Sequence, residues 1–145
     1  NKHGELGGAE THAEARRLQP GLLINDRHFT KEDLVTPEQR IPRTESMICS
    51  GFQVHYLVRK DGVLAAHATT SVASSRAAMI GGVLTSVKFR GQGLGTAVVA
   101  RLCKELLDSG KTPVLFFENP KAASIYHRLG FEDFADWFIV RLKVD

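Results

Sequence analysis

The sequence changes its hydrophobic period at a glycine-rich junction near residue 93, and this change constrains the fold more than any other feature. Before the junction, apolar residues alternate with polar ones or form short apolar runs, as strands require. After it, apolar residues recur about every 3.6 positions. We therefore expect a helix over residues 93–109 whose apolar stripe is Leu94, Ala97, Val98, Leu102 and Leu106.

Two turns divide the segment before the junction into three strands. Residues 52–59 and 63–72 have strand composition and flank the turn formed by residues 60–62, Lys-Asp-Gly. Residues 74–76 can form a second turn, and the apolar run 77–85 that follows predicts a buried third strand. An antiparallel meander is therefore expected ahead of the helix.

A second strand and helix follow the long helix. The apolar run 114–117 predicts a buried strand that completes a parallel crossover. Asn119 can cap a further helix with Pro120 at its first position, and Gly130 can end that helix. Residues 131–142 are rich in aromatic and β-branched residues and predict one or two closing strands. The first 45 residues are interpreted as loops with room for one short helix. The fold class is mixed α/β.

Composition places the chain among soluble globular domains. It has 145 residues, of which 43% are hydrophobic and 24% are charged. Cys49 and Cys103 lie far apart in sequence, so neither a disulfide framework nor a metal cluster is indicated, and we expect a cytoplasmic protein without a metal. No run approaches 18 apolar residues, so we expect no membrane partner.

The positive charge is concentrated around and after the glycines. Residues 83–128 carry seven basic and three acidic side chains, an excess of four, whereas the whole chain carries +3. Such a segment attracts polyanions, from a phosphorylated cofactor to nucleic acid. Because the sequence contains no recognised nucleic-acid motif, we do not expect nucleic acid as a partner.

The glycine-rich segment itself, residues 90–96, indicates phosphate binding. Glycines allow successive backbone N–H groups to converge on an anion at the positive end of a helix dipole. A Walker A loop would need Gly-Lys-Ser/Thr, which is absent, and a dinucleotide fingerprint would need a glycine in place of Thr96. A nicotinamide dinucleotide with Glu118 on its ribose stays a weak alternative, as does a turn that only connects two elements.

Two stretches resemble the GNAT acetyltransferase family. Residues 83–95, Val-Leu-Thr-Ser-Val-Lys-Phe-Arg-Gly-Gln-Gly-Leu-Gly, are similar to its motif A, whose signature is Arg/Gln-x-x-Gly-x-Gly/Ala. Residues 119–131 resemble a later motif in which Asn, Tyr and a terminal Gly-Phe recur at this spacing. The sequence of residues 80–85 is most similar to that of a subgroup in which this domain is the C-terminal part of a longer chain. The missing initial Met agrees with that expectation.

The resemblance implies that the chain binds acetyl-CoA. It predicts a single domain over residues 1–145, with a poorly interpretable part at 1–48 and an acetyl-CoA-binding core at 49–145. Asn119 is explained about equally well as a helix cap. The positions that match the cofactor contacts of the family are Val83, Leu84, Thr85, Arg90, Gly91, Gln92, Gly93, Leu94, Gly95, Thr96, Asn119, Ala122 and Tyr126.

The resemblance also implies direct acetyl transfer to an amine in a ternary complex. Tyr126 matches the tyrosine that protonates the departing thiolate, although its helical position also suits a core residue. Glu118 is the first candidate for the base, against the alternative of a solvated acid. His55 and His67 lie on the hairpin at positions that could face either way, and a lone histidine in a strand is more often a packing or surface residue than a base.

The expected partners are therefore acetyl-CoA and an amine-bearing small molecule or protein, and the expected assembly is a monomer or a homodimer. The alternative function is a non-catalytic acyl-CoA sensor or interaction module of the same fold.

Overall fold

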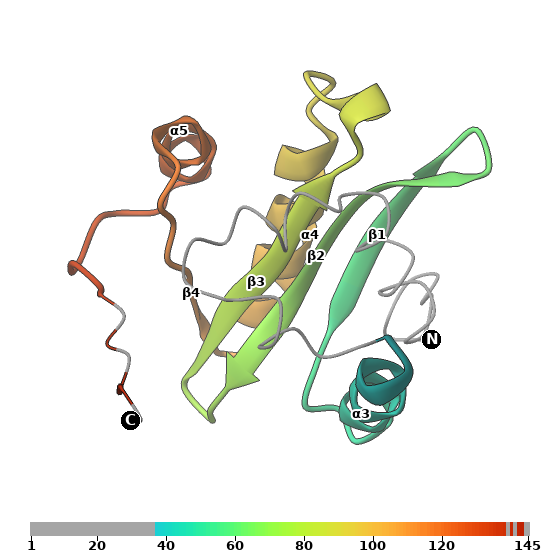
Figure 1. Cartoon of the computed structure of the whole chain (residues 1–145). Coiled ribbons are helices and arrows are strands. Elements are labelled where there is room, and N and C mark those ends of the chain that lie inside the picture. The colour runs from blue at the N-terminus through green and yellow to red at the C-terminus, as the bar shows by residue number, and fades with distance from the viewer. Residues whose placement is uncertain (1–36, 139, 141, 144–145) are drawn as a thin grey trace. The chain divides into compact units, whose positions relative to one another are not determined.

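The computed structural model describes residues 37–138, 140 and 142–143, with side chains from Ile41 onward (Figure 1). The apolar bursts at residues 22–24 and 34–35 lie outside the described residues. The chain forms two compact units that divide between Leu115 and Phe116, and each is described by itself.

A four-stranded sheet forms the centre of the first unit. Its strands are β1 (His55–Lys60), β2 (Val63–Ala73), β3 (Ala77–Thr85) and β4 (Thr112–Val114), in the spatial order β1-β2-β3-β4. The first three are antiparallel neighbours, and β4 runs parallel to β3. In the β1–β2 turn Asp61 and Gly62 have φ values of 54° and 76°, the left-handed pair of a tight hairpin. The predicted meander is confirmed.

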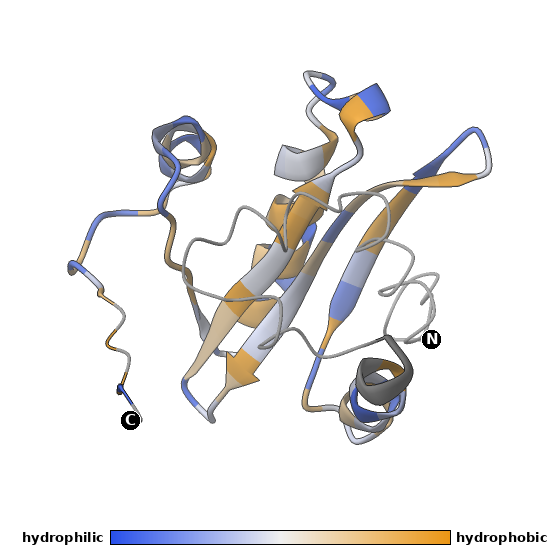
Figure 2. Ribbon diagram, in the orientation of Figure 1, coloured by the Kyte–Doolittle hydropathy of each residue, from blue (hydrophilic) through white to orange (hydrophobic). Residues whose placement is uncertain are grey.

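Helix α4 (Leu94–Asp108) packs against one face of this sheet (Figures 1 and 2). It coincides with the predicted helix except at its ends, and Gly110 follows it with a φ of 73°. Its buried residues are Val98, Val99, Leu102 and Leu106. The expected stripe was wrong at Ala97, which is exposed, because the helix turns Val99 toward the sheet instead.

Two of the three irregularities in strand pairing flank His67 and decide which side chains share a face there. Between the Val58↔Ala66 and Arg59↔Leu64 pairs, β2 contains one extra residue, Ala65. Between the His67↔Leu84 and Thr69↔Gly81 pairs, β3 contains one extra residue, and Gly82 at this position has a φ of 56°. Each is a β-bulge, which bends its strand and redirects the residues beyond it.

The predicted strand at residues 114–117 was wrong in position. β4 ends at Val114, where pairing with Met79 of β3 stops, and Phe116 is 55% exposed. The apolar run indicated burial, but backbone pairing determines the strand. Pro113 lies within it, as an edge strand tolerates.

The N-terminal part of the described chain is helix α3 (Pro37–Cys49), which contains Pro42. It is consistent with the short helix that the first 45 residues could accommodate, although it extends to residue 49. No helix in the described ranges combines the length and the apolar character that crossing a membrane requires.

The second unit contains α5 (Pro120–Arg128). The side chain of Asn119 accepts a hydrogen bond from the Lys121 N–H at 2.9 Å, so the predicted cap is confirmed. Gly130 follows the helix with a φ of 94°. The closing strands expected at residues 131–142 were wrong: the described residues of this tail form no strand, and Phe134 is 92% exposed. Apolar and β-branched residues favour strands only where a neighbouring edge accepts their backbone hydrogen bonds.

Candidate functional site

The glycine loop leads directly into the N-terminus of α4. A short 3-10 turn, η2 (Val87–Phe89), follows β3, and Gly91 and Gly93 then both have a φ of 75°. An added Cβ at either glycine would meet no atom within 4 Å, so the space in front of the loop is open. No side chain among the described residues caps the helix, and its first turn contains no acidic residue. The N–H groups of this turn are therefore available to an anion.

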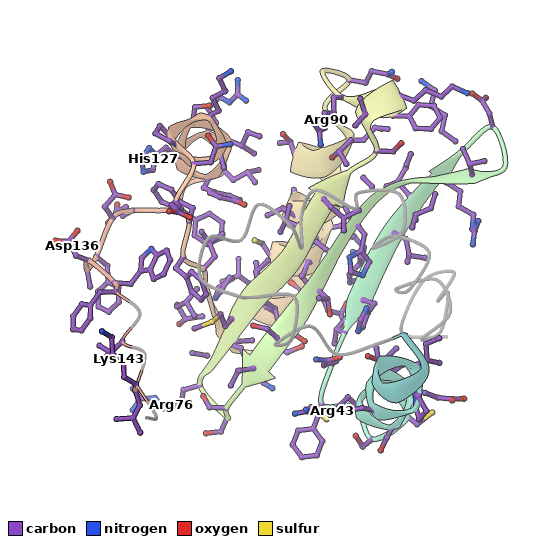
Figure 3. The ribbon with its side chains drawn as sticks, viewed as in Figure 1. Arg43, Arg76, Arg90, His127, Asp136 and Lys143 are labelled. Carbon is purple, nitrogen blue, oxygen red and sulfur yellow. The ribbon has the colours of Figure 1, made fainter. Side chains whose placement is uncertain are left out.

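Gly95 allows α4 to begin close to the end of β3. A Cβ at this position would lie 2.8 Å from Oγ1 of Thr85, which is too close for any larger residue without a shift. The Nε–H of Arg90 donates a hydrogen bond to the carbonyl of Thr85 at 3.2 Å (Figure 3). Both ends of the loop thus lie close to the last residue of β3, and Arg90 is hydrogen-bonded to it.

Basic side chains surround the beginning of the loop. The ammonium group of Lys88 lies 5.1 Å from the centre of the Phe89 ring, and that of Lys60 lies 5.9 Å from it. Lys60 also donates a hydrogen bond to the side chain of Gln92. Phe89 is buried, and its ring attracts both ammonium groups. Because two positive charges lie beside the loop, the local electrostatic potential favours an anionic ligand.

The edge of β3 next to this loop is covered by β4 only in part. β4 pairs with β3 only at residues 77–79, so no described strand pairs with that edge over residues 80–85. Val83 and Thr85 are half-buried and Leu84 is buried. An extended ligand with amide groups can hydrogen-bond to such an edge.

The remaining predicted residues lie in the second unit. Tyr126 is buried against Phe117 and Phe131, with 6.0 Å between ring centres in both pairs. Burial raises the pKa of its phenol, and no described residue accepts a hydrogen bond from its hydroxyl. Ala122 is half-buried on the same helix.

The sequence indicated that Glu118 lies at the end of a strand, but the structure places it outside any strand. It is exposed and follows β4 by four residues, because β4 ends at Val114. The side chain of His127 is 46% exposed, and its Nε2 lies 2.9 Å from Oδ1 of Asp133.

Sequence analysis missed a buried histidine pair. His55 and His67 are 1% and 0% exposed, and their facing ring nitrogens lie 3.1 Å apart. The other nitrogen of His67 lies 2.8 Å from the carbonyl oxygen of Gly82. Burial, together with His67, lowers the pKa of His55 to about 4, so neither strand histidine resembles a solvent-accessible base.

The cysteines lie apart from these groups. Cys49 is exposed, Cys103 is half-buried with a pKa raised by burial, and both are free thiols. Within the described ranges, no cluster of three or more His, Cys, Asp or Glu side chains is arranged to hold a metal.

Comparison with known proteins assigns the chain to a family. A family model described as FR47-like protein matches residues 57–139, and no curated protein sequence matches the chain. Among solved structures, glucosamine-6-phosphate N-acetyltransferase from Arabidopsis thaliana is 20% identical, with a TM-score of 0.68 over 89% of this chain and 92% of that one.

Two further structures have the same fold. A predicted acetyltransferase from Clostridium acetobutylicum, solved with acetyl-CoA, is 14% identical, with a TM-score of 0.73 over 93% of this chain and 92% of that one. A GCN5-related N-acetyltransferase from Ralstonia eutropha is 12% identical, with a TM-score of 0.71 over 92% and 94%. Because the family model covers more than half of its residues, the chain belongs to the FR47-like family, and its fold is that of the GNAT acetyltransferases.

Proposed function

We propose that this chain transfers the acetyl group of acetyl-CoA to a primary amine by direct transfer in a ternary complex. The observation that carries the proposal is the uncapped N-terminus of α4, which follows two glycines at positive φ with open space before them. The neighbours support it: one is an N-acetyltransferase of an amino sugar phosphate, and another was solved with acetyl-CoA.

The residues of this chain suit the parts of acetyl-CoA. The diphosphate would bind the N–H groups of residues 91–96, with Lys60, Lys88 and Arg90 providing positive charge nearby. The amides of the pantetheine arm would bind along residues 83–85, where β4 does not pair with β3. When bound, acetyl-CoA supplies an activated carbonyl carbon and a thiolate leaving group.

Proton transfer would fall to two side chains. The nitrogen of the amine would bond to the carbonyl carbon of acetyl-CoA as the carbon–sulfur bond breaks. Glu118 would accept the proton that this nitrogen loses, directly or through water. Tyr126 would donate its phenolic proton to the departing sulfur. A raised pKa suits this role because the phenol stays protonated and neutral until the thiolate forms. Its hydroxyl also has no competing described acceptor.

A matched pair of glycine variants tests the loop. Gly93 and Gly110 have φ values of 75° and 73°, and an added Cβ would meet nothing within 4 Å at either position. Gly93→Val and Gly110→Val therefore introduce similar backbone strain, but only the first places a side chain where the diphosphate is proposed. We expect calorimetric titration with acetyl-CoA to show binding to wild type and Gly110→Val and loss of binding in Gly93→Val.

The same titration with NAD, followed by a CoA-release assay over a panel of amines, separates the candidate functions. Release of CoA with at least one amine supports the transferase. Binding of acetyl-CoA without release on any amine favours the non-catalytic sensor instead. If Gly93→Val and Gly110→Val bind acetyl-CoA equally well, or if NAD binds in its place, the loop does not hold CoA.

A further inference from the structure

The side chains of Gln53, His55 and His67 form a chain of contacts that ends on the bulge in β3. The side-chain oxygen of Gln53 lies 3.2 Å from Nε2 of His55, and Nδ1 of His55 lies 3.1 Å from Nε2 of His67. Nδ1 of His67 lies 2.8 Å from the carbonyl oxygen of Gly82. Both histidines are almost completely buried, so bulk water does not compete for these contacts.

The contacts permit one direction of hydrogen bonding when both rings are neutral. A carbonyl oxygen only accepts, so Nδ1 of His67 must carry a hydrogen and its Nε2 must be the acceptor. His55 then donates from Nδ1 and accepts at Nε2. The amide of Gln53 must therefore present its N–H₂ group to His55, which a half-turn of the amide provides.

Burial supports the neutral state. Removal from water, with His67 as a second cause, lowers the pKa of His55 to about 4, so the ring is uncharged at neutral pH. When His67 is neutral as well, its contact with the Gly82 carbonyl fixes the Nδ1–H tautomer on both rings.

Gly82, the last residue in this chain of contacts, has little space for a side chain. Gly82 has a φ of 56°, and an added Cβ would lie 2.9 Å from Cγ2 of Thr69 and 3.4 Å from Cε1 of His67. Thr69 is itself fixed, because its hydroxyl donates to the carbonyl of Val54 at 3.0 Å. The bulge is therefore enclosed on the β2 side, and the direction in which β3 continues depends on these contacts.

We propose that Gln53, His55 and His67 are positioning residues that fix the carbonyl of Gly82 and thereby orient the backbone of residues 83–85 toward the pantetheine arm. This inference rests on the proposed function, because it assigns the bulge a role in binding acetyl-CoA. None of the three residues touches the reacting atoms.

Two substitutions of His67 separate this role from a purely structural one. An Asn amide nitrogen occupies nearly the place of Nδ1 and can still donate to Gly82, whereas Leu cannot. Leu106→Ala is the control: Leu106 is buried in α4 about 18 Å along the helix from Leu94, and its loss lowers stability without touching the bulge.

We expect His67→Leu to weaken acetyl-CoA binding about tenfold, His67→Asn to restore most of that affinity, and Leu106→Ala to bind like wild type. The proposal is overturned if His67→Leu binds no more weakly than Leu106→Ala, or if His67→Asn is as weak as His67→Leu.

A long-range ¹H–¹⁵N spectrum of the imidazoles tests the chain of hydrogen bonds without any ligand. We expect Nδ1–H tautomers for both His55 and His67 at neutral pH, and an Nε2–H tautomer on either ring contradicts the proposed direction. If both tautomers are as expected but wild type does not bind acetyl-CoA, the hydrogen-bond chain stands, while the proposed function and the link to pantetheine both fail.

Discussion

The two tyrosines of this chain are both buried, but their hydroxyl groups differ in what they contact. The Tyr56 hydroxyl donates to Glu105 at 3.1 Å, whereas no described residue accepts from that of Tyr126. Tyr56→Phe should therefore lower the free energy of unfolding by about 1 kcal/mol and leave kcat unchanged. Tyr126→Phe should leave stability nearly unchanged and lower kcat about a hundredfold with little change in acetyl-CoA affinity.

Urea unfolding and steady-state kinetics on the two variants give the comparison. Equal turnover by Tyr126→Phe and wild type would remove the general-acid role and leave Tyr126 as a core residue.

His55 makes stability depend on pH in a defined direction. Its pKa is about 4 in the folded protein and 6.5 when unfolded, so between these values the unfolded chain binds more protons. The contribution of the neutral ring is fully present above pH 6.5 and is lost as the pH falls toward 4, by roughly 3 kcal/mol in all.

The variant His55→Gln lacks this titration and serves as the reference. Between about pH 7 and pH 4.5, urea unfolding should show a larger loss of stability for wild type than for the variant. Parallel pH profiles for the two proteins would contradict the depressed pKa.

At the scale of elements, the sequence predicted those helices, strands and turns that depend only on residues close together in the chain. The hairpin turn at Asp61 and Gly62, the strand 77–85 and helix α4 follow from turn chemistry and hydrophobic period alone. The strand near residue 114 and the tail did not, because a strand also needs a partner edge that the local sequence does not reveal.

The histidine pair was missed for a related reason. A regular hairpin around Asp61 and Gly62 would place His55 opposite Ala68, and His67 would then face the other side of the sheet. The extra residue Ala65 shifts the register so that His55 pairs with Thr69, which puts both histidines on one face. A single bulge therefore creates this contact, and nothing in the sequence marks Ala65 as the extra residue.

Asn119 combines two possible roles at the start of α5. Its side chain caps the helix, so Asn119→Ala should lower stability by about 1 kcal/mol, whereas serine retains an acceptor and should preserve it. If Asn119 also contacts acetyl-CoA, as the family motif implies, Asn119→Ser should keep its stability and still lose affinity about fivefold. Thermal unfolding and calorimetric titration measure the two effects separately, and wild-type affinity in the serine variant would reduce Asn119 to a cap.

At the scale of the whole molecule, the positions that match the family's cofactor contacts are distributed over both compact units. The glycine loop and residues 83–85 of β3 belong to the first, whereas Asn119, Ala122 and Tyr126 belong to the second. No run of glycine, serine or proline marks a linker at the division after Leu115, and the sequence predicted one continuous domain there. A ligand that contacts both units should stabilise them together.

Hydrogen exchange with and without acetyl-CoA tests that expectation. At a ligand concentration one hundred times Kd, binding stabilises the native protein by about 2.7 kcal/mol, and the amides at the ligand contacts should slow accordingly. We expect slower exchange both in the first turn of α4 and in α5, and we expect Gly93→Val to abolish the effect at both places. Protection confined to α4 would mean that the cofactor binds the first unit alone. Tyr126 would then lie outside the site, and the proton for the thiolate would have to come from another group.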